Sequence, residues 1–177
     1  MYDNISPRID NEAPFRNIID YKKKEGTMKY HCSATALARY IVQKCYIDKR
    51  PISNLQLQKI LYFLQIMYGR STHGTELLFR DEFEAWPYGP VIFAVYDEFS
   101  RYGGSVIEAT FNEPDPCSQE VMAFIDQTVT FLREKTPWEL VEISHAQGSP
   151  WDLTYQGGKG RKKAIPQQYI INAISER

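Results

Sequence analysis

The run Trp86-Pro87-Tyr88-Gly89-Pro90 decides the fold that we predict for this 177-residue sequence. Proline fixes one backbone angle and glycine permits conformations that other residues avoid, so the run is typical of a tight turn. Acidic and apolar residues alternate just before it, in Glu82-Phe83-Glu84-Ala85, which predicts a short strand or an irregular hairpin over residues 76–86. At the end of the run, Gly89-Pro90 predicts the start of a helix, because proline is favoured at the first helical position.

Helical spacing of apolar residues dominates the sequence before this turn. Ser33 is a favourable N-cap, and small and apolar residues recur behind it at helical spacing as far as Cys45. A second helix is expected after Ser53, which forms a capping-box pattern with Gln56, and we expect that helix to end at Gly69. The second helix is apolar nearly all round, which is typical of a helix at the centre of a fold.

Further helices are predicted in the second half of the chain. Ser118 is expected to cap one of them, and Thr136-Pro137-Trp138-Glu139 is a second capping box with proline at the first helical position. Pro166 is expected to open the last helix, and Gly157–Lys163 to form a flexible basic loop. The sequence therefore predicts a mainly α fold, a compact bundle of about six helices with one short β hairpin or strand element.

The chain is expected to divide into an N-terminal extension, residues 1–27, and one domain, residues 28–177. The extension is polar and rich in asparagine, so we expect it to be partly ordered at best. Met28 directly precedes the first convincing helix, and one hypothesis takes Met28 as the true start of the protein. The remaining length suits a single domain with its own core.

Composition excludes several classes of protein. The 21 basic and 22 acidic residues give a net charge of −1, which argues against a dedicated nucleic-acid binder, and the basic loop Lys159–Lys163 is expected to be solvated. The three cysteines contain no CxxC pair, so reduced thiols in the cytoplasm are expected. The N-terminus has no signal-peptide pattern, and no apolar run approaches the ~20 residues that cross a membrane.

Catalytic and metal chemistry find little support in the sequence. The glycine-rich run before Lys163 lacks the Gly-Lys-Ser/Thr ending of a phosphate-binding loop, and no histidines have the spacing of a zinc site, so neither a cofactor nor a metal is predicted. His145 is the one candidate general base, with Ser144 and Asp152 near it in sequence. Adjacent helical residues point in different directions, so a structural, partly buried His145 is favoured over an enzyme centred on it.

Two charged residues lie in apolar surroundings, Lys59 in the second helix and Glu84 before the turn. Buried charges are usually paired, so we expect these two side chains to form an ion pair that joins the helix to the β element. Together with Gly89 and Pro90 of the turn, they are predicted to be structural residues.

Aromatic residues make up 14% of the chain, a load that suits a core and an interface. Phe99 is expected in the core. Tyrosine and tryptophan at turns and helix ends are frequent in the hot spots of protein interfaces. On that ground the candidate interface residues are Trp86, Tyr88, Tyr96, Tyr102 and Trp151.

Several motifs resemble those of a known family. Leu55-Gln56-Leu57-Gln58-Lys59-Ile60-Leu61-Tyr62-Phe63 resembles its LQKLLYF helix, and Glu84-Ala85-Trp86-Pro87-Tyr88-Gly89-Pro90-Val91 resembles its AW-x-YGPV core. Ser144-His145 and Pro150-Trp151 resemble two further segments. The sequence is thereby similar to the Panacea antitoxin domain, over about residues 33–174, a family that includes Soc-type antitoxin adaptors.

This resemblance implies an antitoxin that neutralises a cognate toxin protein by direct, stoichiometric binding, often borne by a phage or another mobile element. It attaches no catalytic residues to the chain. The alternative that it implies is a proteolytic adaptor, or a phage–host interaction protein, that delivers a client to a host protease such as ClpXP. It implies nothing about the oligomeric state.

Overall fold

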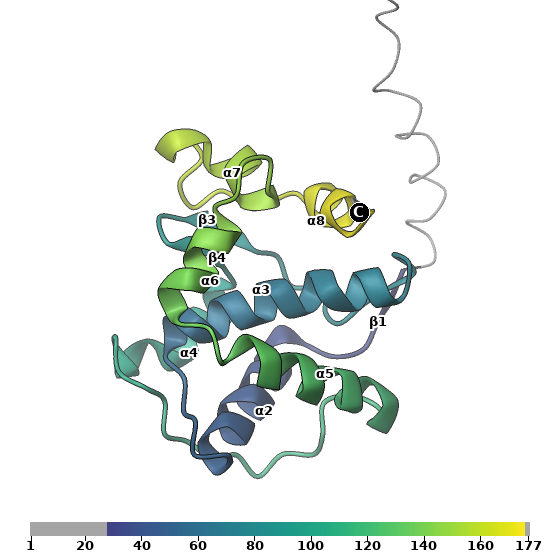
Figure 1. The fold of residues 1–177 in the computed structure, drawn as a ribbon, viewed down its shortest axis with the longest axis vertical. Coiled ribbons are helices and arrows are strands. Elements are labelled where there is room, and N and C mark those ends of the chain that lie inside the picture. Colours follow the sequence, from purple (N-terminus) through teal and green to yellow (C-terminus); the bar gives the residue numbers. More distant parts are fainter. Residues whose placement is uncertain (1–27, 176–177) are drawn as a thin grey trace, which may run out of the picture.

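The computed structural model describes residues 28–175, and the predicted N-terminal extension, residues 1–27, lies outside this part (Figure 1). The described chain is mainly helical with two small sheets, which confirms the predicted fold class. In chain order the elements are β1 (Lys29–Tyr30), α2 (Ala34–Ile47), α3 (Asn54–Ser71), β2 (Glu76–Leu77), β3 (Glu84–Trp86), β4 (Gly89–Val91), α4 (Phe93–Phe99), the 3-10 turn Ser100–Tyr102, α5 (Gln119–Leu132), α6 (Pro137–Ser144), α7 (Pro150–Tyr155), the 3-10 turn Gln156–Gly158 and α8 (Gln167–Ser175).

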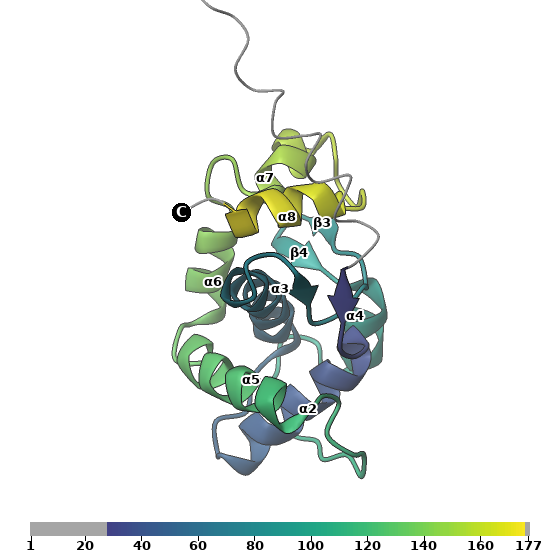
Figure 2. The same ribbon diagram turned by 90° about the vertical axis from the view of Figure 1, so that its right-hand side faces the viewer.

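Helix α3 is the centre of the fold, as its apolar character predicted. Figure 2 looks nearly along α3 and shows α5, α6 and α8 around it, with the strands on the remaining side. Its buried apolar residues include Leu57, Leu61 and Leu64, none of which has measurable exposure. Fully burying one such leucine contributes about 2 kcal/mol, so α3 holds much of the hydrophobic stabilisation of the domain.

The buried polar residues of α3 satisfy backbone groups of the irregular segments that pack on it. The Gln65 amide donates to the Phe79 carbonyl at 2.8 Å and accepts from the Leu78 amide at 3.0 Å. Gln58 accepts from the Ile92 amide at 2.9 Å. Strands as short as these leave many backbone groups unpaired, and a buried unpaired group is costly, so polar side chains from the central helix take the place of missing strand partners.

The central turn connects two antiparallel strands. Trp86 pairs with Gly89 and Glu84 with Val91, so Pro87 and Tyr88 are the two turn residues. The expected β element is present, but its hairpin covers residues 84–91 and not 76–86, and the predicted helix start at Gly89-Pro90 is wrong, because α4 begins at Phe93. The positive φ of Gly89, 97°, fits the turn and not a helix.

Several expected helix ends are confirmed and others are wrong. Ser33 caps α2, and Thr136 and Glu139 form the complete capping box of α6. Ser53 caps α3, but the Gln56 side chain donates to backbone carbonyls near the end of α5 and does not close a capping box. Ser118 makes no side-chain capping bond.

Gly69 does not end α3, which continues to Ser71. A methyl group at Gly69 would collide with the Ile174 side chain, so this glycine allows α8 to lie close against α3. None of the described helices is long and apolar enough to cross a bilayer.

Candidate protein-binding surface at the hairpin

Lys59 of α3 contacts the hairpin from the interior of the protein. The Lys59 side chain is fully buried, and its ammonium nitrogen donates to the Pro90 carbonyl at 2.7 Å. The predicted ion pair with Glu84 is wrong, because the Glu84 carboxylate accepts from the Trp86 indole nitrogen at 2.8 Å instead. Among the described residues no carboxylate lies within ion-pair distance of Lys59. Burial lowers the pKa of Lys59 from 10.5 to about 7.

Gly89 of the hairpin lies beside both Lys59 and Ser144, the last residue of α6. A side-chain carbon at Gly89 would lie 2.6 Å from the Ser144 hydroxyl oxygen and 2.7 Å from Cε of Lys59. Only glycine fits between these groups, and only glycine adopts the local backbone angle without strain. The hairpin therefore lies close against side chains of both α3 and α6.

Trp151 holds the other strand of the hairpin. Its indole nitrogen donates to the Trp86 carbonyl at 2.8 Å, and only 7% of the residue is exposed. Trp151 is thus an interior residue, and its prediction as an interface residue is wrong. Its indole N–H already donates to the hairpin backbone, so this group is not available to a partner protein.

His145 stacks flat on Trp151, with ring centroids 3.6 Å apart and an angle of 5° between the planes. Burial lowers the pKa of His145, and the nearby charge of Lys59 lowers it further. Its Nε2 atom is buried without a hydrogen-bond partner, and the adjacent Ser144 hydroxyl donates to the Val141 carbonyl. Among the described residues His145 is therefore a stacked side chain without a hydrogen-bonded carboxylate or thiol, and its structural role stays a prediction.

Five aromatic residues lie around the anchored turn, and together we call them the aromatic surface. Tyr88 and Trp138 are each 59% exposed, and their rings meet edge to face at 5.4 Å. The half-buried Trp86 lies 4.8 Å from the ring of Tyr96 and 6.5 Å from that of Phe93. The aromatic surface consists of Trp86, Tyr88, Phe93, Tyr96 and Trp138.

Sequence reasoning found three of these five residues. Phe93 and Trp138 were not among the interface candidates, and their exposure, 52% and 59%, is what adds them to the aromatic surface. The remaining candidate, Tyr102, lies on the 3-10 turn after α4, beside Arg101, and makes none of the ring contacts of the aromatic surface.

The basic segment after α7 adjoins the aromatic surface. The Lys162 ammonium lies 4.6 Å from the centroid of the Trp86 ring, a cation–π contact. The Lys162 amide donates to the Ala85 carbonyl at 2.7 Å and the Ala85 amide to the Lys163 carbonyl at 2.9 Å. The segment predicted as a flexible loop is therefore fastened along the edge of β3, and it places positive charge beside the aromatic rings.

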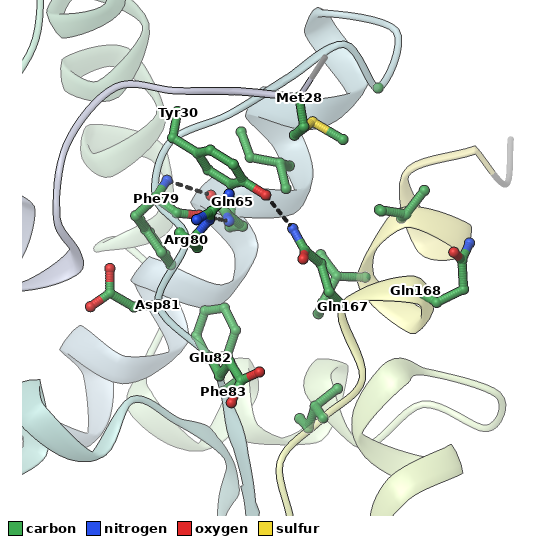
Figure 3. Close-up of a pocket in the computed structure, with 15 residues that line it drawn as sticks. Met28, Tyr30, Gln65, Phe79, Arg80, Asp81, Glu82, Phe83, Gln167 and Gln168 are labelled. Carbon is green, nitrogen blue, oxygen red and sulfur yellow. Dashed lines mark hydrogen bonds between the residues drawn. The ribbon is translucent and has the colours of Figure 1, made fainter. Parts of the chain in front are cut away.

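A separate pocket of about 520 Å³ lies between α8, the segment Arg80–Phe83 and the start of the described chain (Figure 3). Some of its lining groups bond one another: the Gln167 amide donates to the Tyr30 hydroxyl at 2.6 Å, and Gln65 bonds the Phe79 backbone, while Arg80, Asp81 and Glu82 add charged groups to the wall. Within residues 28–175, no group of three His, Cys, Asp or Glu side chains is placed to hold a metal ion.

The motifs that carry the family resemblance converge on one place in the structure. Gly89 belongs to the hairpin, Lys59 comes from α3, and His145 and Trp151 follow α6 closely in sequence; each of the last three contacts the hairpin or a residue that anchors it. The motifs thus describe how the hairpin is anchored, and the exposed rings of Tyr88 and Trp138 are presented by that anchor.

Comparison with known proteins identifies the class. The family model described as "Antitoxin SocA-like, Panacea domain" matches residues 57–152. The curated protein Antitoxin SocA of Caulobacter vibrioides (strain NA1000 / CB15N) is 32% identical over 141 residues, which cover 70% of this chain and 71% of that protein. No solved structure gives a significant match. The chain belongs to the SocA-like antitoxin family with a Panacea domain, which confirms the resemblance seen in the sequence.

Proposed function

We propose that this protein is an antitoxin that neutralises a cognate toxin protein by direct, stoichiometric binding, and that the aromatic surface is where the toxin binds. Membership of the SocA-like antitoxin family supports the antitoxin role. The observation that carries the location is the exposure of large rings on an anchored hairpin: Tyr88 and Trp138 at 59% and Phe93 at 52%.

Anchoring makes these rings effective for binding. A surface that is already ordered loses little conformational entropy when a partner binds, so more of the contact energy appears as affinity. The hairpin carrying Tyr88 is fixed by Lys59 from one side and by Trp151 from the other. Tyrosine and tryptophan add large contact area with few rotatable bonds, which is why they dominate interface hot spots.

The basic segment suggests the charge of the partner. Lys159, Arg161, Lys162 and Lys163 follow α7, and Lys162 already touches Trp86. Charges at the rim of an interface steer association and select partners more than they add affinity. We propose that the toxin presents acidic groups around an apolar centre, and that salt slows association.

Co-expression with the product of the adjacent gene tests the proposal. We expect the wild-type protein to rescue growth and to co-purify with the toxin in a 1:1 ratio. Tyr88→Ala and Trp138→Ala should each weaken the complex by a factor of about 30, the effect of a hot-spot loss of about 2 kcal/mol.

Ile47→Ala is the matched control, because Ile47 is also 59% exposed but ends α2, away from the hairpin. It should bind like the wild-type protein. Equal binding by all three variants would place the toxin elsewhere, and an adjacent product that is harmless alone would contradict the antitoxin role itself. Rescue that disappears in a strain lacking ClpXP would favour the adaptor alternative.

A further inference from the structure

Helices α2 and α5 run in the same direction, and three side-chain pairs along and just beyond them keep nearly the same offset in sequence. The Tyr40 hydroxyl donates to Asp126 at 2.6 Å, Arg133 donates to Asp48 at 2.5 Å, and Arg50 donates to Glu134 at 2.7 Å. The partners in these three pairs are 86, 85 and 84 residues apart. Both ribbon views place α5 beside α2 (Figures 1 and 2).

Two cysteines continue this register at the start of both helices. Cys32 directly precedes Ser33, the N-cap of α2, and Cys117 directly precedes Ser118, the N-cap of α5. Cys32 and Cys117 are therefore 85 residues apart, the same offset as Asp48 and Arg133. The first residues of the two helices, Ala34 and Gln119, have this offset too, so both cysteines lie at the same end of the helix pair.

The ionisation of the two thiols agrees with this placement. The Cys32 thiol donates to the Leu78 carbonyl at 3.6 Å; the interaction with Cys117 raises the pKa of Cys32, and the interaction with Cys32 lowers the pKa of Cys117. The Cys32 backbone amide donates to the Leu78 carbonyl at 3.0 Å, which fixes the position of the first thiol. Both cysteines are partly exposed, whereas Cys45 is fully buried.

We propose that Cys32 and Cys117 are an oxidation site, at which a hydroperoxide converts the two neighbouring thiols into a reversible intramolecular disulfide. The Cys117 thiolate attacks the peroxide, its sulfur takes one oxygen as a sulfenic acid, and hydroxide leaves and takes up a proton to form water. The Cys32 thiol then loses its proton and attacks the Cys117 sulfur, and a second water leaves. Two thiols thus lose two protons and two electrons, and hydrogen peroxide becomes two waters.

The disulfide would connect the residue before the N-cap of α2 to the residue before the N-cap of α5, and it would close a loop that contains α3 and the hairpin. A cross-link over so long a loop restricts the unfolded chain more than the folded one, so the oxidised protein is the more stable form. None of the ring contacts of the aromatic surface involves Cys32 or Cys117. Oxidation therefore changes the stability of the domain without touching the proposed toxin contact.

Peptide mapping of the full-length protein tests the site. After treatment with hydrogen peroxide and blocking of free thiols with N-ethylmaleimide, trypsin releases the three cysteines on separate peptides: residues 30–39, 45–49 and 102–133. We expect a cross-link between residues 30–39 and 102–133 on a monomer, which dithiothreitol reverses, while Cys45 stays reduced. Cross-links only between molecules, linkage to Cys45, or two thiols that remain open to N-ethylmaleimide would overturn the proposal.

Thermal unfolding provides an independent measurement. The oxidised wild-type protein should unfold at a higher Tm than the reduced protein, and dithiothreitol should abolish the difference. Cys117→Ser is the matched variant, in which peroxide should leave Tm without this rise. An oxidised form whose Tm is equal to or below that of the reduced form would overturn the stabilising role.

Discussion

Lys59 shows how single residues determine the geometry of the hairpin. It is a fully buried ammonium group whose partner is the backbone carbonyl of Pro90. A buried charge without a carboxylate is costly, and the cost appears as a pKa lowered to about 7. Folding therefore favours the neutral form of this lysine over its charged form.

This lowered pKa predicts a pH dependence of stability. Between pH 7 and pH 10.5 the unfolded chain holds a proton on Lys59 that the folded chain releases, so the free energy of unfolding rises with pH. We expect a rise of about 2 kcal/mol from pH 7 to pH 9 that depends on Lys59. Urea denaturation of the wild-type protein and of Lys59→Met across this range measures it, because the variant lacks the titrating group. Parallel curves for the two proteins would contradict the prediction.

Gly89 gives a second test at the level of a residue. Gly89→Ala forces a side chain onto Lys59 and Ser144 and requires a φ of 97°, so we expect it to lower the free energy of unfolding by about 2 kcal/mol or more. Gly104→Ala is the control, since nothing lies within 4 Å of that position and its φ is not positive. It should change stability by less than about 0.5 kcal/mol. Similar urea midpoints for both variants would refute the close approach seen here.

Residue types allowed some of the residues that anchor the hairpin to be predicted. Lys59 and Glu84 stood out because they are charges in apolar surroundings. Their partners could not be predicted, since a backbone carbonyl leaves no mark in a sequence. Trp151 was predicted to lie on the surface for a similar reason. Its indole N–H donates to the Trp86 backbone carbonyl, and this partner cannot be recognised in the sequence.

At the scale of elements, helix caps were the most predictable features. Thr136 and Glu139 contact each other's backbone within one turn, so their spacing in sequence determines the contact. Gly89-Pro90 misled because the same dipeptide suits a helix start and a turn exit. The choice between them was made by α3, whose Lys59 and Gln58 bind the Pro90 carbonyl and the Ile92 amide.

Replacing the N-cap residues of α5 and α6 by alanine should lower the stability of the protein by unequal amounts. Thr136→Ala removes a bond to the Glu139 amide and should cost about 1 kcal/mol of stability. Ser118→Ala removes no side-chain capping bond, so it should cost less than half as much. Chemical denaturation of both variants under one set of conditions makes the comparison. A larger loss for Ser118→Ala would mean that its hydroxyl caps α5 in solution.

At the scale of the whole molecule, the described core extends from Ala34 to Ile174 and gives the domain its own hydrophobic interior. We expect a protein that starts at Met28 to unfold in one cooperative transition, with a Tm within about 2 °C of the full chain. Calorimetry of both proteins tests this domain boundary. A broad or much lower transition would show that residues 1–27 contribute to the fold. An intact mass of the natively expressed protein tests the separate hypothesis that Met28 is the true start.

Long-range relations were the least predictable. The helices that surround α3 could be predicted, because helical spacing is a local property. The sequence did not reveal the common register of α2 and α5, or the meeting of Tyr88 with Trp138, because each joins segments that are distant in the chain. The aromatic surface therefore emerges only when α4, α6 and the hairpin are brought together.

The close packing of α8 on α3 has a consequence for how the protein is made. A ribosome produces the central helix well before α8, the helix that covers Gly69. Until Ile174 has left the ribosome, one apolar side of α3 stays open. The domain can therefore complete its core only after α8 has been synthesised, and it folds as a unit at that point.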